Sequence, residues 1–183
     1  MSIGNTAYHH VLFKFKNIKY KEKPHINGKL RIYKSGLIKL GKQVKINSGA
    51  RYNPIGGDLR TVFSVNKGAS LEIGDFTGIS NTAIVCRNHI KIGDYVRIGG
   101  GTKIYDTDFH SLDYLQRCDK TKDIPVSKPV VIKDYAFIGA HSIILKGVTI
   151  GTKSIIGASS VVTKSVPDGE IWAGNPARFI KKI

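Results

Sequence analysis

A six-residue period runs through the C-terminal half of the chain and limits the fold more than any other feature. Between residues 132 and 162 an Ile or Val recurs at every sixth position without a slip. These positions are Ile132, Ile138, Ile144, Ile150, Ile156 and Val162. A six-residue spacing matches neither the 3.6-residue repeat of an α-helix nor the simple alternation of a long strand. The chain therefore needs an architecture in which every sixth residue returns to the interior.

Small residues complete this period. The residue four positions after each Ile or Val is small or β-branched, namely Ala136, Ser142, Val148, Ser154, Ser160 and Val166. Residues i and i+4 of an extended chain point to the same side, so both positions face inward. Glycine directly follows the Ile at Gly139, Gly151 and Gly157, which suits a corner where the backbone needs freedom. The pattern predicts short strands joined by corners, three of them in each coil of about 18 residues.

The same period is present upstream. Ile73, Ile79 and Val85 are in phase, one extra residue intervenes, and the period continues at Ile92, Ile98 and Ile104, with a weaker stretch at Leu40 and Ile46. The phase is lost between Tyr52 and Ser70, where we expect an irregular coil or an excursion. Stacked coils bury the Ile column and pair their backbones with the coils above and below. We therefore predict an all-β solenoid over residues 31–166, capped by a basic segment at 1–30 and a tail at 167–183.

A long break in the period is the candidate site of chemistry. After Ile104 the pattern is absent until Ile132, and we expect residues 106–129 to project from the solenoid as a loop. His110 lies near the start of this loop, and an imidazole can take a proton from a hydroxyl near neutral pH. Asp106 and Asp108 lie within four residues of it, and a carboxylate bonded to one ring nitrogen would fix the tautomer. The sequence leaves open which Asp, if either, does so.

Positive charge is concentrated near the N-terminus. The chain of 183 residues has 29 Lys and Arg against 13 Asp and Glu, a net charge of +16. Eleven of the basic residues, but only one acid, Glu22, lie in the first 45 positions. This segment suits an anionic lipid surface, a nucleic acid, or plain solvation. Interleaved residues such as Phe13 and Phe15 favour lipid over nucleic acid, for which no known module is present.

Motifs and apolar runs that the sequence lacks indicate the cellular compartment. Cys86 and Cys118 form neither a disulfide framework nor a zinc motif. The apolar stretch at 11–13 is broken by Lys14 and Lys16, and no run of apolar residues is long enough to span a membrane. We expect a cytoplasmic protein, with contact at the inner face of the membrane as an option.

The repeat resembles that of the hexapeptide-repeat acyltransferases, whose fold is a left-handed parallel β-helix. The resemblance covers residues 70–183 and is most specific at 150–167 and at 171–178, Ile-Trp-Ala-Gly-Asn-Pro-Ala-Arg. These segments look like the closing signature of the galactoside and maltose acetyltransferase group. Within that group, the sequence is most similar to the capsule and lipopolysaccharide sugar O-acetyltransferases. The resemblance implies acetyl-CoA as co-substrate, a sugar or glycan acceptor, no metal, and a homotrimer with active sites between subunits.

The resemblance also assigns roles to individual residues. His110 becomes the general base that deprotonates an acceptor hydroxyl, and the hydroxyl attacks the thioester of acetyl-CoA directly. Asp108 is our candidate for orienting the ring, although the choice of Asp stays open. The backbone N–H of Ala140 becomes the donor to the oxyanion. An acceptor contact is implied for Asn81, and we expect Tyr105 and Asp106 to bind the acceptor as well. Contacts to CoA are implied for Phe137, Gly139, Ala140, Ala158, Thr163, Lys164 and Arg178.

Other functions fit parts of the pattern. A general base also serves an N-acyltransferase that acts on a nucleotide-linked amino sugar. A γ-type carbonic anhydrase uses the same fold but needs a second His five residues from the first, where this chain has Leu115 or Tyr105. The other candidate histidines, His89 and His141, are scattered in register. A non-catalytic scaffold is a further alternative, against which the tail and the His110 loop argue.

Overall fold

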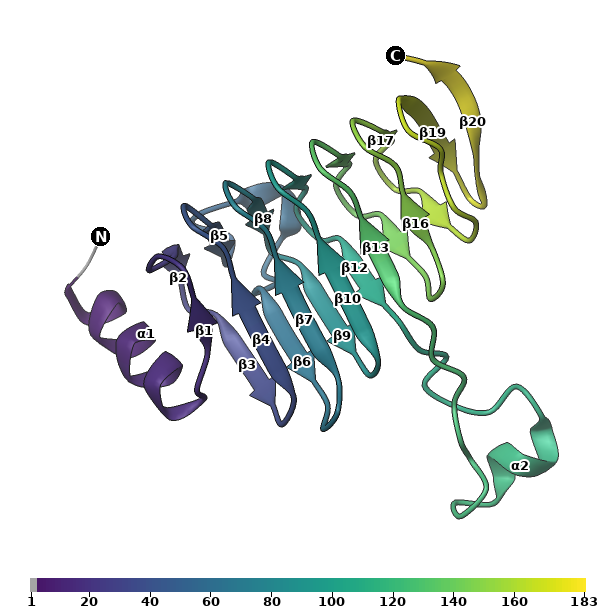
Figure 1. Cartoon of the computed structure of the whole chain (residues 1–183), viewed down its shortest axis with the longest axis horizontal. Helices are drawn as coiled ribbons and strands as arrows, with labels where there is room; N and C mark the ends of the chain where they lie inside the picture. Colours follow the sequence, from purple (N-terminus) through teal and green to yellow (C-terminus); the bar gives the residue numbers. More distant parts are fainter. Residues whose placement is uncertain (1–2) are drawn as a thin grey trace.

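The computed structural model describes residues 3–183 and is a left-handed parallel β-helix capped at both ends (Figure 1). Three sheets, which we name A, B and C, form the sides of a triangular coil. We name the corners between them AB, BC and CA, in the order in which the chain passes through them.

Each sheet collects one strand from every coil. Sheet A has the order β1 (Lys19–Tyr20), β4 (Leu37–Leu40), β7 (Ser70–Ile73), β10 (His89–Ile92), β13 (Val130–Ile132), β16 (Thr149–Ile150). Sheet B has the order β2 (His25–Gly28), β5 (Lys45–Ser48), β8 (Gly78–Ser80), β11 (Arg97–Ile98), β14 (Phe137–Ile138), β17 (Ile155–Ile156), β19 (Glu170–Gly174), β20 (Ala177–Lys182). Sheet C has the order β3 (Arg31–Lys34), β6 (Val62–Val65), β9 (Ala83–Cys86), β12 (Lys103–Tyr105), β15 (Ile143–Ile144), β18 (Val161–Val162).

The period-six residues stack as predicted. Ile132, Ile138 and Ile144 are fully buried and lie in sheets A, B and C respectively. Their partners in the next coil are Ile150, Ile156 and Val162. The small residues four positions on, such as Ser142, are also buried. Each coil therefore contributes one layer to a continuous apolar core, and neighbouring coils satisfy each other's backbone groups.

One phase assignment was wrong by a single residue. We predicted that Val85 faces inward, but Ile84 is the buried residue of β9 and Val85 lies on the outward face of sheet C. The reason is the corner at Asn81, where Thr82 rather than Ala83 takes the buried small position. The longer corner that follows β9 restores the phase at Ile92, which pairs with Ile73.

The two ends of the core are covered differently (Figure 1). Helix α1 (Ile3–Phe15) lies across the first coil and buries Phe13. The first strands, β1 and β2, already fall inside the segment 1–30, so the solenoid starts earlier than the sequence pattern indicated. At the other end β19 and β20 form an antiparallel hairpin, and Trp172 packs against the core.

Aspartates brace the AB corners. The side chains of Asp75, Asp94 and Asp134 each accept the backbone N–H of the equivalent corner residue one coil earlier, at 2.7–3.0 Å. Asp168 does the same for the N–H of Thr152 at 2.9 Å. The backbone hydrogen bond from Lys42 holds the pKa of Asp75 below its usual value. Each of these aspartates therefore gives a corner N–H the acceptor that it would otherwise lack.

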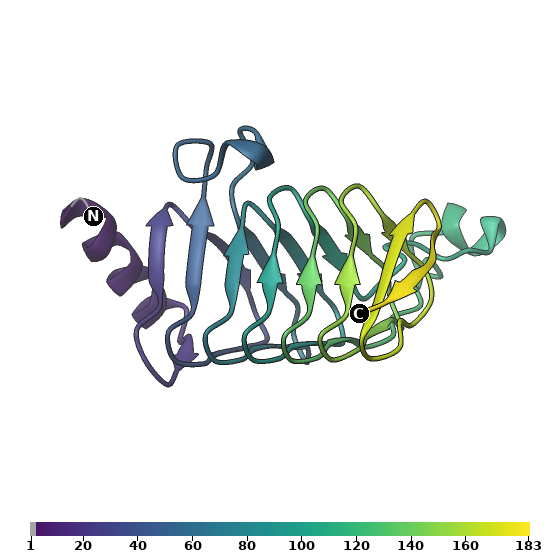
Figure 2. The same ribbon diagram turned by 90° about the horizontal axis from the view of Figure 1, so that it is seen from above.

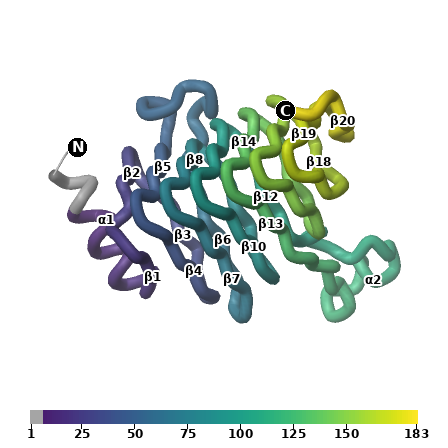
Figure 3. Tube along the Cα trace, turned by 45° about the horizontal axis from the view of Figure 1, so that its top comes forward, coloured from purple at the N-terminus to yellow at the C-terminus, as the bar shows by residue number. Residues whose placement is uncertain are grey.

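Two excursions leave the coil on different sides (Figures 2 and 3). The first covers residues 49–61 between β5 and β6 and contains the 3₁₀ turn Pro54–Gly56. It falls at the start of the stretch where the period was lost, and the regular coil resumes with β6 at Val62. The second is the predicted loop 106–129, which carries the short helix α2 (Tyr114–Cys118). No helix within residues 3–183 is long and apolar enough to cross a membrane.

Candidate active site

The loop 106–129 leaves the β-helix at a CA corner through a narrow neck. Thr107 and Ser127 form an antiparallel bridge. The N–H of Asp108 donates to the Val126 carbonyl at 3.1 Å, and the N–H of Lys128 donates to the Asp106 carbonyl at 2.9 Å. The neck fixes the base of the loop, and the distal part with α2 projects away from the coils (Figure 1).

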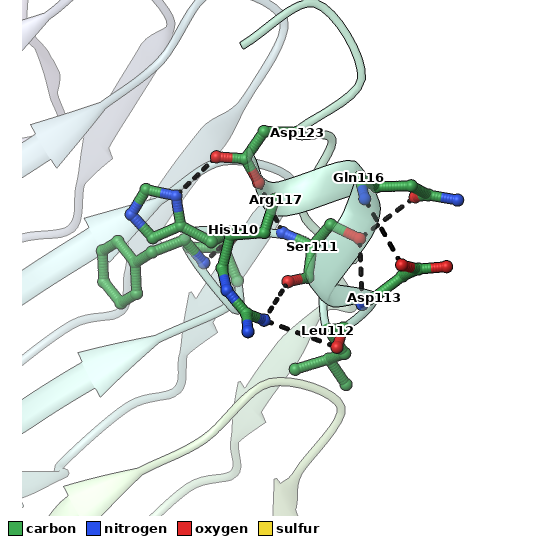
Figure 4. A network of polar contacts seen from close by, with 9 residues as sticks. His110, Ser111, Leu112, Asp113, Gln116, Arg117 and Asp123 are labelled. Carbon is green, nitrogen blue, oxygen red and sulfur yellow. Dashed lines mark hydrogen bonds and ion pairs between the residues drawn. The ribbon is translucent and has the colours of Figure 1, made fainter. Parts of the chain in front are cut away.

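His110 is held by a carboxylate that the sequence did not single out. Its Nδ1 lies 2.6 Å from Oδ2 of Asp123, at the far end of the same loop (Figure 4). Oδ1 of Asp123 accepts the N–H of Ser111 at 2.7 Å. The contact with His110 is the main reason why the pKa of Asp123 is below its usual value. Since Nδ1 is engaged, Nε2 on the other side of the exposed ring is the nitrogen available to a substrate.

The short helix α2 braces this pair (Figure 4). Asp113 caps its N-terminus by accepting the N–H groups of Leu115 and Gln116. Arg117, one turn further on, donates to the Ser111 carbonyl at 2.8 Å and also contributes to the lowered pKa of Asp123. The loop thus fixes the backbone next to His110 through a helix of its own.

The two aspartates predicted to orient His110 have other partners. Asp106 is completely buried, and its carboxylate accepts the N–H groups of Arg87 and Asn88 at 2.7 and 2.8 Å. Asp108 forms an ion pair with Lys146 at 2.8 Å, while its Oδ2 is buried without a hydrogen-bond partner. In this structure Asp123 therefore replaces Asp108 as the carboxylate on the His110 ring, and Asp106 is not accessible to an acceptor. Asp123 is thirteen residues from His110, so no local spacing pointed to it.

The predicted acceptor residues Asn81 and Tyr105 differ in their accessibility. Asn81 is only 1% exposed, its Oδ1 accepts the Gly49 N–H, and its Nδ2 donates to the Asn53 carbonyl, both at 2.8 Å. Its amide therefore fastens the 49–61 excursion and is not open to an acceptor. Tyr105 lies on the outward face of sheet C with its ring edge-on to Phe109, and partial burial raises its pKa.

The BC corner at Ala140 lacks the aspartate that accepts a backbone N–H at several AB corners. Gly139, Ala140 and Ala158 come together here, and the N–H groups of Ala140 and Ala158 have no acceptor among residues 3–183. At the equivalent AB corner the N–H of Asp94 is taken by Asp134 of the next coil. The residue that corresponds to Asp134 is Ala158, whose methyl group cannot accept a hydrogen bond. The substitution of Ala for Asp in this column thus leaves the Ala140 N–H available as a donor.

Glycine keeps these donors accessible. A Cβ atom at Gly99 would lie 2.6 Å from the Ala140 nitrogen, and one at Gly139 would lie 2.4 Å from the Ala158 nitrogen. Any larger residue would displace the corner above it. The glycine after each Ile is therefore required for close stacking of the coils and for access to the N–H groups.

The remaining residues predicted to contact CoA lie in three places: on sheet B, in the C-terminal hairpin and at a CA corner. Phe137 is exposed on the outward face of sheet B, at the strand that leads into the Gly139 corner. Arg178 lies in β20, opposite Ala173 of β19. Thr163 and Lys164 follow β18 and are exposed at a CA corner, the same kind of corner from which the His110 loop leaves. The structure does not gather all of these residues at one point of a single chain.

His110 and Ala140 are likewise separated within the chain. The His110 loop follows the end of β12, whereas Ala140 precedes the start of β15, its parallel neighbour in sheet C. The two groups thus lie toward opposite ends of the strands of sheet C. Of the other histidines, His89 bonds to the Ser70 hydroxyl on sheet A at 2.7 Å, and the His141 ring lies over Gly101 at a BC corner.

Comparison with known proteins agrees with the fold and the repeat. The family model of the bacterial transferase hexapeptide (six repeats) matches residues 129–164. Residues 129–164 of the chain thus carry the repeat that is typical of these transferases. A hexapeptide-repeat acetyltransferase of Vibrio cholerae, solved in complex with acetyl-CoA, matches all of this chain. The match has 27% identity and a TM-score of 0.62, and it covers 79% of the Vibrio protein.

Other solved structures differ in the acceptor that their names imply. A maltose O-acetyltransferase of Clostridium difficile matches all of the chain and 78% of its own, with 25% identity and a TM-score of 0.67. The N-acyltransferase AntD of Bacillus cereus, in complex with dTDP and coenzyme A, matches 94% of the chain and 88% of its own, with 25% identity and a TM-score of 0.65. The structural relatives thus include both O- and N-acyltransferases.

The curated sequence relatives are longer than the matched region. A Saccharomyces cerevisiae protein described as an acetyltransferase shares 36% identity over 122 residues, which are 66% of this chain and 60% of the yeast protein. A tetrahydropyridine-dicarboxylate N-acetyltransferase of Staphylococcus aureus shares 45% identity over 58 residues, 24% of its length. The chain therefore spans less than two thirds of these relatives.

Proposed function

We propose that this chain is a hexapeptide-repeat transferase that moves an acetyl group from acetyl-CoA to a hydroxyl of a sugar in a bacterial surface glycan such as capsule or lipopolysaccharide. The observation that carries the proposal is the pair formed by His110 and Asp123 at 2.6 Å on a loop that is braced from within. A carboxylate on Nδ1 leaves Nε2 as a base and stabilises the imidazolium that forms when it takes a proton.

The proposed reaction is a direct transfer. Nε2 of His110 accepts the proton of the acceptor hydroxyl while that oxygen bonds to the thioester carbon. The bond from this carbon to the CoA sulfur then breaks, and the imidazolium returns its proton to the sulfur. The N–H of Ala140 donates to the thioester oxygen, on which negative charge accumulates during the attack. A preorganised donor of this kind is worth roughly 10²–10³ in rate.

The residues at the BC corner suit acetyl-CoA. The carbonyl and amide groups of its pantetheine arm need hydrogen-bond partners, and the N–H of Ala158 is free to donate. Lys164, at a CA corner, and Arg178, in β20, would supply positive charge for the phosphate groups once a second copy brings them to the same site. When bound, acetyl-CoA supplies the activated acyl group, and the chain itself supplies the base, the oxyanion donor and the cations.

A homotrimer would bring together what one chain separates. The outward face of sheet C between the His110 loop and the Ala140 corner carries Ile143, Leu145 and Val161, all partly exposed. The outward face of sheet A includes the charged residues Lys39, Glu72 and Lys91. We propose that this apolar face packs against a second copy, so that His110 of one subunit faces Ala140 of the next. Three such contacts would give three sites in each assembly.

An N-acyltransferase for a nucleotide-linked amino sugar is the second candidate. The likeness to AntD, an N-acyltransferase seen with dTDP and coenzyme A, favours it. The base required is the same, although a neutral amine needs less help than a hydroxyl.

We also propose a cytoplasmic location at the inner face of the membrane, where lipid-linked glycans would be available. Helix α1 supports this part of the proposal. Tyr8, Val11 and Phe15 recur along one side of it and are 39, 65 and 81% exposed, while the basic residues Lys14 and Lys16 lie beside them. An apolar stripe flanked by lysines matches a helix that lies in a membrane surface.

A transfer assay with labelled acetyl-CoA tests the proposed chemistry. Purified protein is incubated with acceptors of the two classes, a glycan fraction and a set of UDP- and dTDP-amino sugars. Mild alkali releases acetate from esters but not from amides. With the wild type we expect label in the glycan fraction, and mild alkali should remove it. The His110→Ala variant should transfer no label. Alkali-stable label on an amino sugar would replace the proposal with the second candidate, and transfer to neither class would reject both.

A further inference from the structure

The excursion 49–61 shapes a pocket that the sequence analysis did not identify. The pocket has a volume of about 400 Å³ and lies against sheet C on the N-terminal side of the His110 coil. The excursion provides one wall through Asp58, Leu59 and Arg60, and Asn81 anchors the excursion from below. A volume of this size suits a small molecule or the charged end of a larger one.

Three cations line the pocket. Arg31 comes from β3, Arg60 from the excursion and Lys103 from β12, so the chain gathers them from three separate segments. None of them forms an ion pair within residues 3–183, in contrast to Lys21, Lys39 and Lys133, which pair with carboxylates on sheet A or its corner. Asp58 is the only acid in the lining, so the pocket is positively charged overall.

The position of the pocket connects it to the proposed chemistry. Gly101 and Thr102 form part of its lining, and the His141 ring lies directly over Gly101. His141 is the neighbour of Ala140, the proposed oxyanion donor. A ligand whose charged group sits among the three cations would therefore extend toward the place where the acyl group is transferred.

We propose that this pocket binds the phosphate or pyrophosphate group of the acceptor, which rests on the proposed function and defines its substrate class as a phosphate-linked sugar. Two arginines can each bind phosphate oxygens with paired N–H donors, and a lysine adds a point charge. A neutral free sugar offers no negative charge to these three cations, so the pocket favours a phosphate-linked acceptor over it. A nucleotide sugar and a lipid pyrophosphate sugar both have this group.

The proposal is tested by calorimetric titration of the full chain with UDP, dTDP, geranyl pyrophosphate and inorganic pyrophosphate. We expect saturable binding of pyrophosphate compounds, weakened about tenfold or more in Arg31→Gln/Arg60→Gln, because each lost charge-assisted contact is worth up to about tenfold in affinity. The variant Lys91→Gln, which removes one charge from sheet A, should bind as the wild type does. Preference for UDP or dTDP would indicate a nucleotide sugar, and preference for geranyl pyrophosphate a lipid-linked one.

A parallel titration with acetyl-CoA separates this proposal from the previous one. We expect Arg31→Gln/Arg60→Gln to bind acetyl-CoA with unchanged affinity. If the double variant instead loses affinity for acetyl-CoA, the cations serve the CoA phosphates and the inference is wrong. If the wild type binds acetyl-CoA but no pyrophosphate compound, the inference alone fails. If it binds pyrophosphate but not acetyl-CoA, the proposed function fails and the anion pocket remains.

Discussion

At the scale of single residues, His110 and Asp123 divide the work of the proposed base. His110 exposes Nε2, and Asp123 holds Nδ1 while also accepting the backbone N–H of Ser111. Asp123 is therefore tied to the loop backbone and to the ring, so it fixes the orientation of the imidazole. The ion pair of Asp108 with Lys146 instead joins the neck of the loop to the next coil.

Loss of the base should affect turnover and leave binding intact. We expect His110→Ala to lower turnover by about 10²–10⁴, the usual contribution of a general base. Asp123→Asn should lower turnover less, because the base remains but its tautomer is no longer imposed. Both variants should bind acetyl-CoA nearly as the wild type does, as measured by calorimetry. Joint loss of CoA binding and of folding in His110→Ala would contradict the assignment of His110 as the base.

The free N–H of Ala140 gives a second test at this scale. Ala158→Asp places a carboxylate at the position that Asp134 occupies beside the Asp94 N–H. We expect the new carboxylate to capture the Ala140 N–H and to lower turnover by about 10²–10³, the value of one oxyanion donor. The melting temperature should not fall, since the same arrangement braces the AB corners. Full activity in Ala158→Asp would exclude the Ala140 N–H from catalysis, and Ala158→Ser serves as a milder control.

At the scale of elements, the repeat explains why so much of the fold could be predicted. Ile132, Ile138 and Ile144 each specify a strand, a face and a position in the stack, because the period is regular and the side chains alternate. The prediction placed Val85 in the interior where the structure has Ile84. A corner that is one residue shorter has no recognisable signal in the sequence. The early start of the coil at β1 was also missed, because Lys19 and Tyr20 carry no apolar repeat.

The candidate site was less predictable than the fold. His110 could be found because it opens a long break in the period. Its partner Asp123 could not, since a loop without a repeat brings together residues with no fixed spacing. The amide of Asn81 matched a motif but is engaged by Gly49 and Asn53 of an excursion whose path the sequence did not reveal.

Helix α1 provides a test of the membrane proposal. We expect Val11→Glu/Phe15→Glu to weaken binding to vesicles that contain anionic lipid by at least about tenfold, because each side chain contributes about 1.5–3 kcal/mol when buried. Cosedimentation with vesicles measures the effect, and Phe179→Glu/Ile180→Glu on the hairpin at the other end is the matched control. If both double variants sediment with the vesicles as much as the wild type does, α1 does not contact the bilayer.

At the scale of the whole molecule, the β-helix is a rigid scaffold that holds groups far apart along its surface. The His110 loop and the Ala140 corner lie toward opposite ends of the strands of sheet C, and the apolar outward face lies between them. Assembly of several copies on this face would complete the site, so oligomerisation and activity should be lost together.

This coupling is tested by a charge on the apolar face. We expect Ile143→Arg to give a monomer in light scattering and to lose at least about 90% of the turnover, because a buried unpaired charge costs several kcal/mol at an interface. Thr149→Arg introduces the same charge on sheet A and should leave the assembly unchanged. An active monomer of the Ile143→Arg variant would mean that a single chain contains the complete site.

The central claim is that the folded chain binds acetyl-CoA for transfer, and calorimetric titration of the purified protein with acetyl-CoA and with free CoA tests it most directly. We predict saturable binding of both compounds with a stoichiometry near one per chain, and weaker binding in the Lys164→Gln/Arg178→Gln variant. A folded protein that binds neither compound would contradict the proposed function.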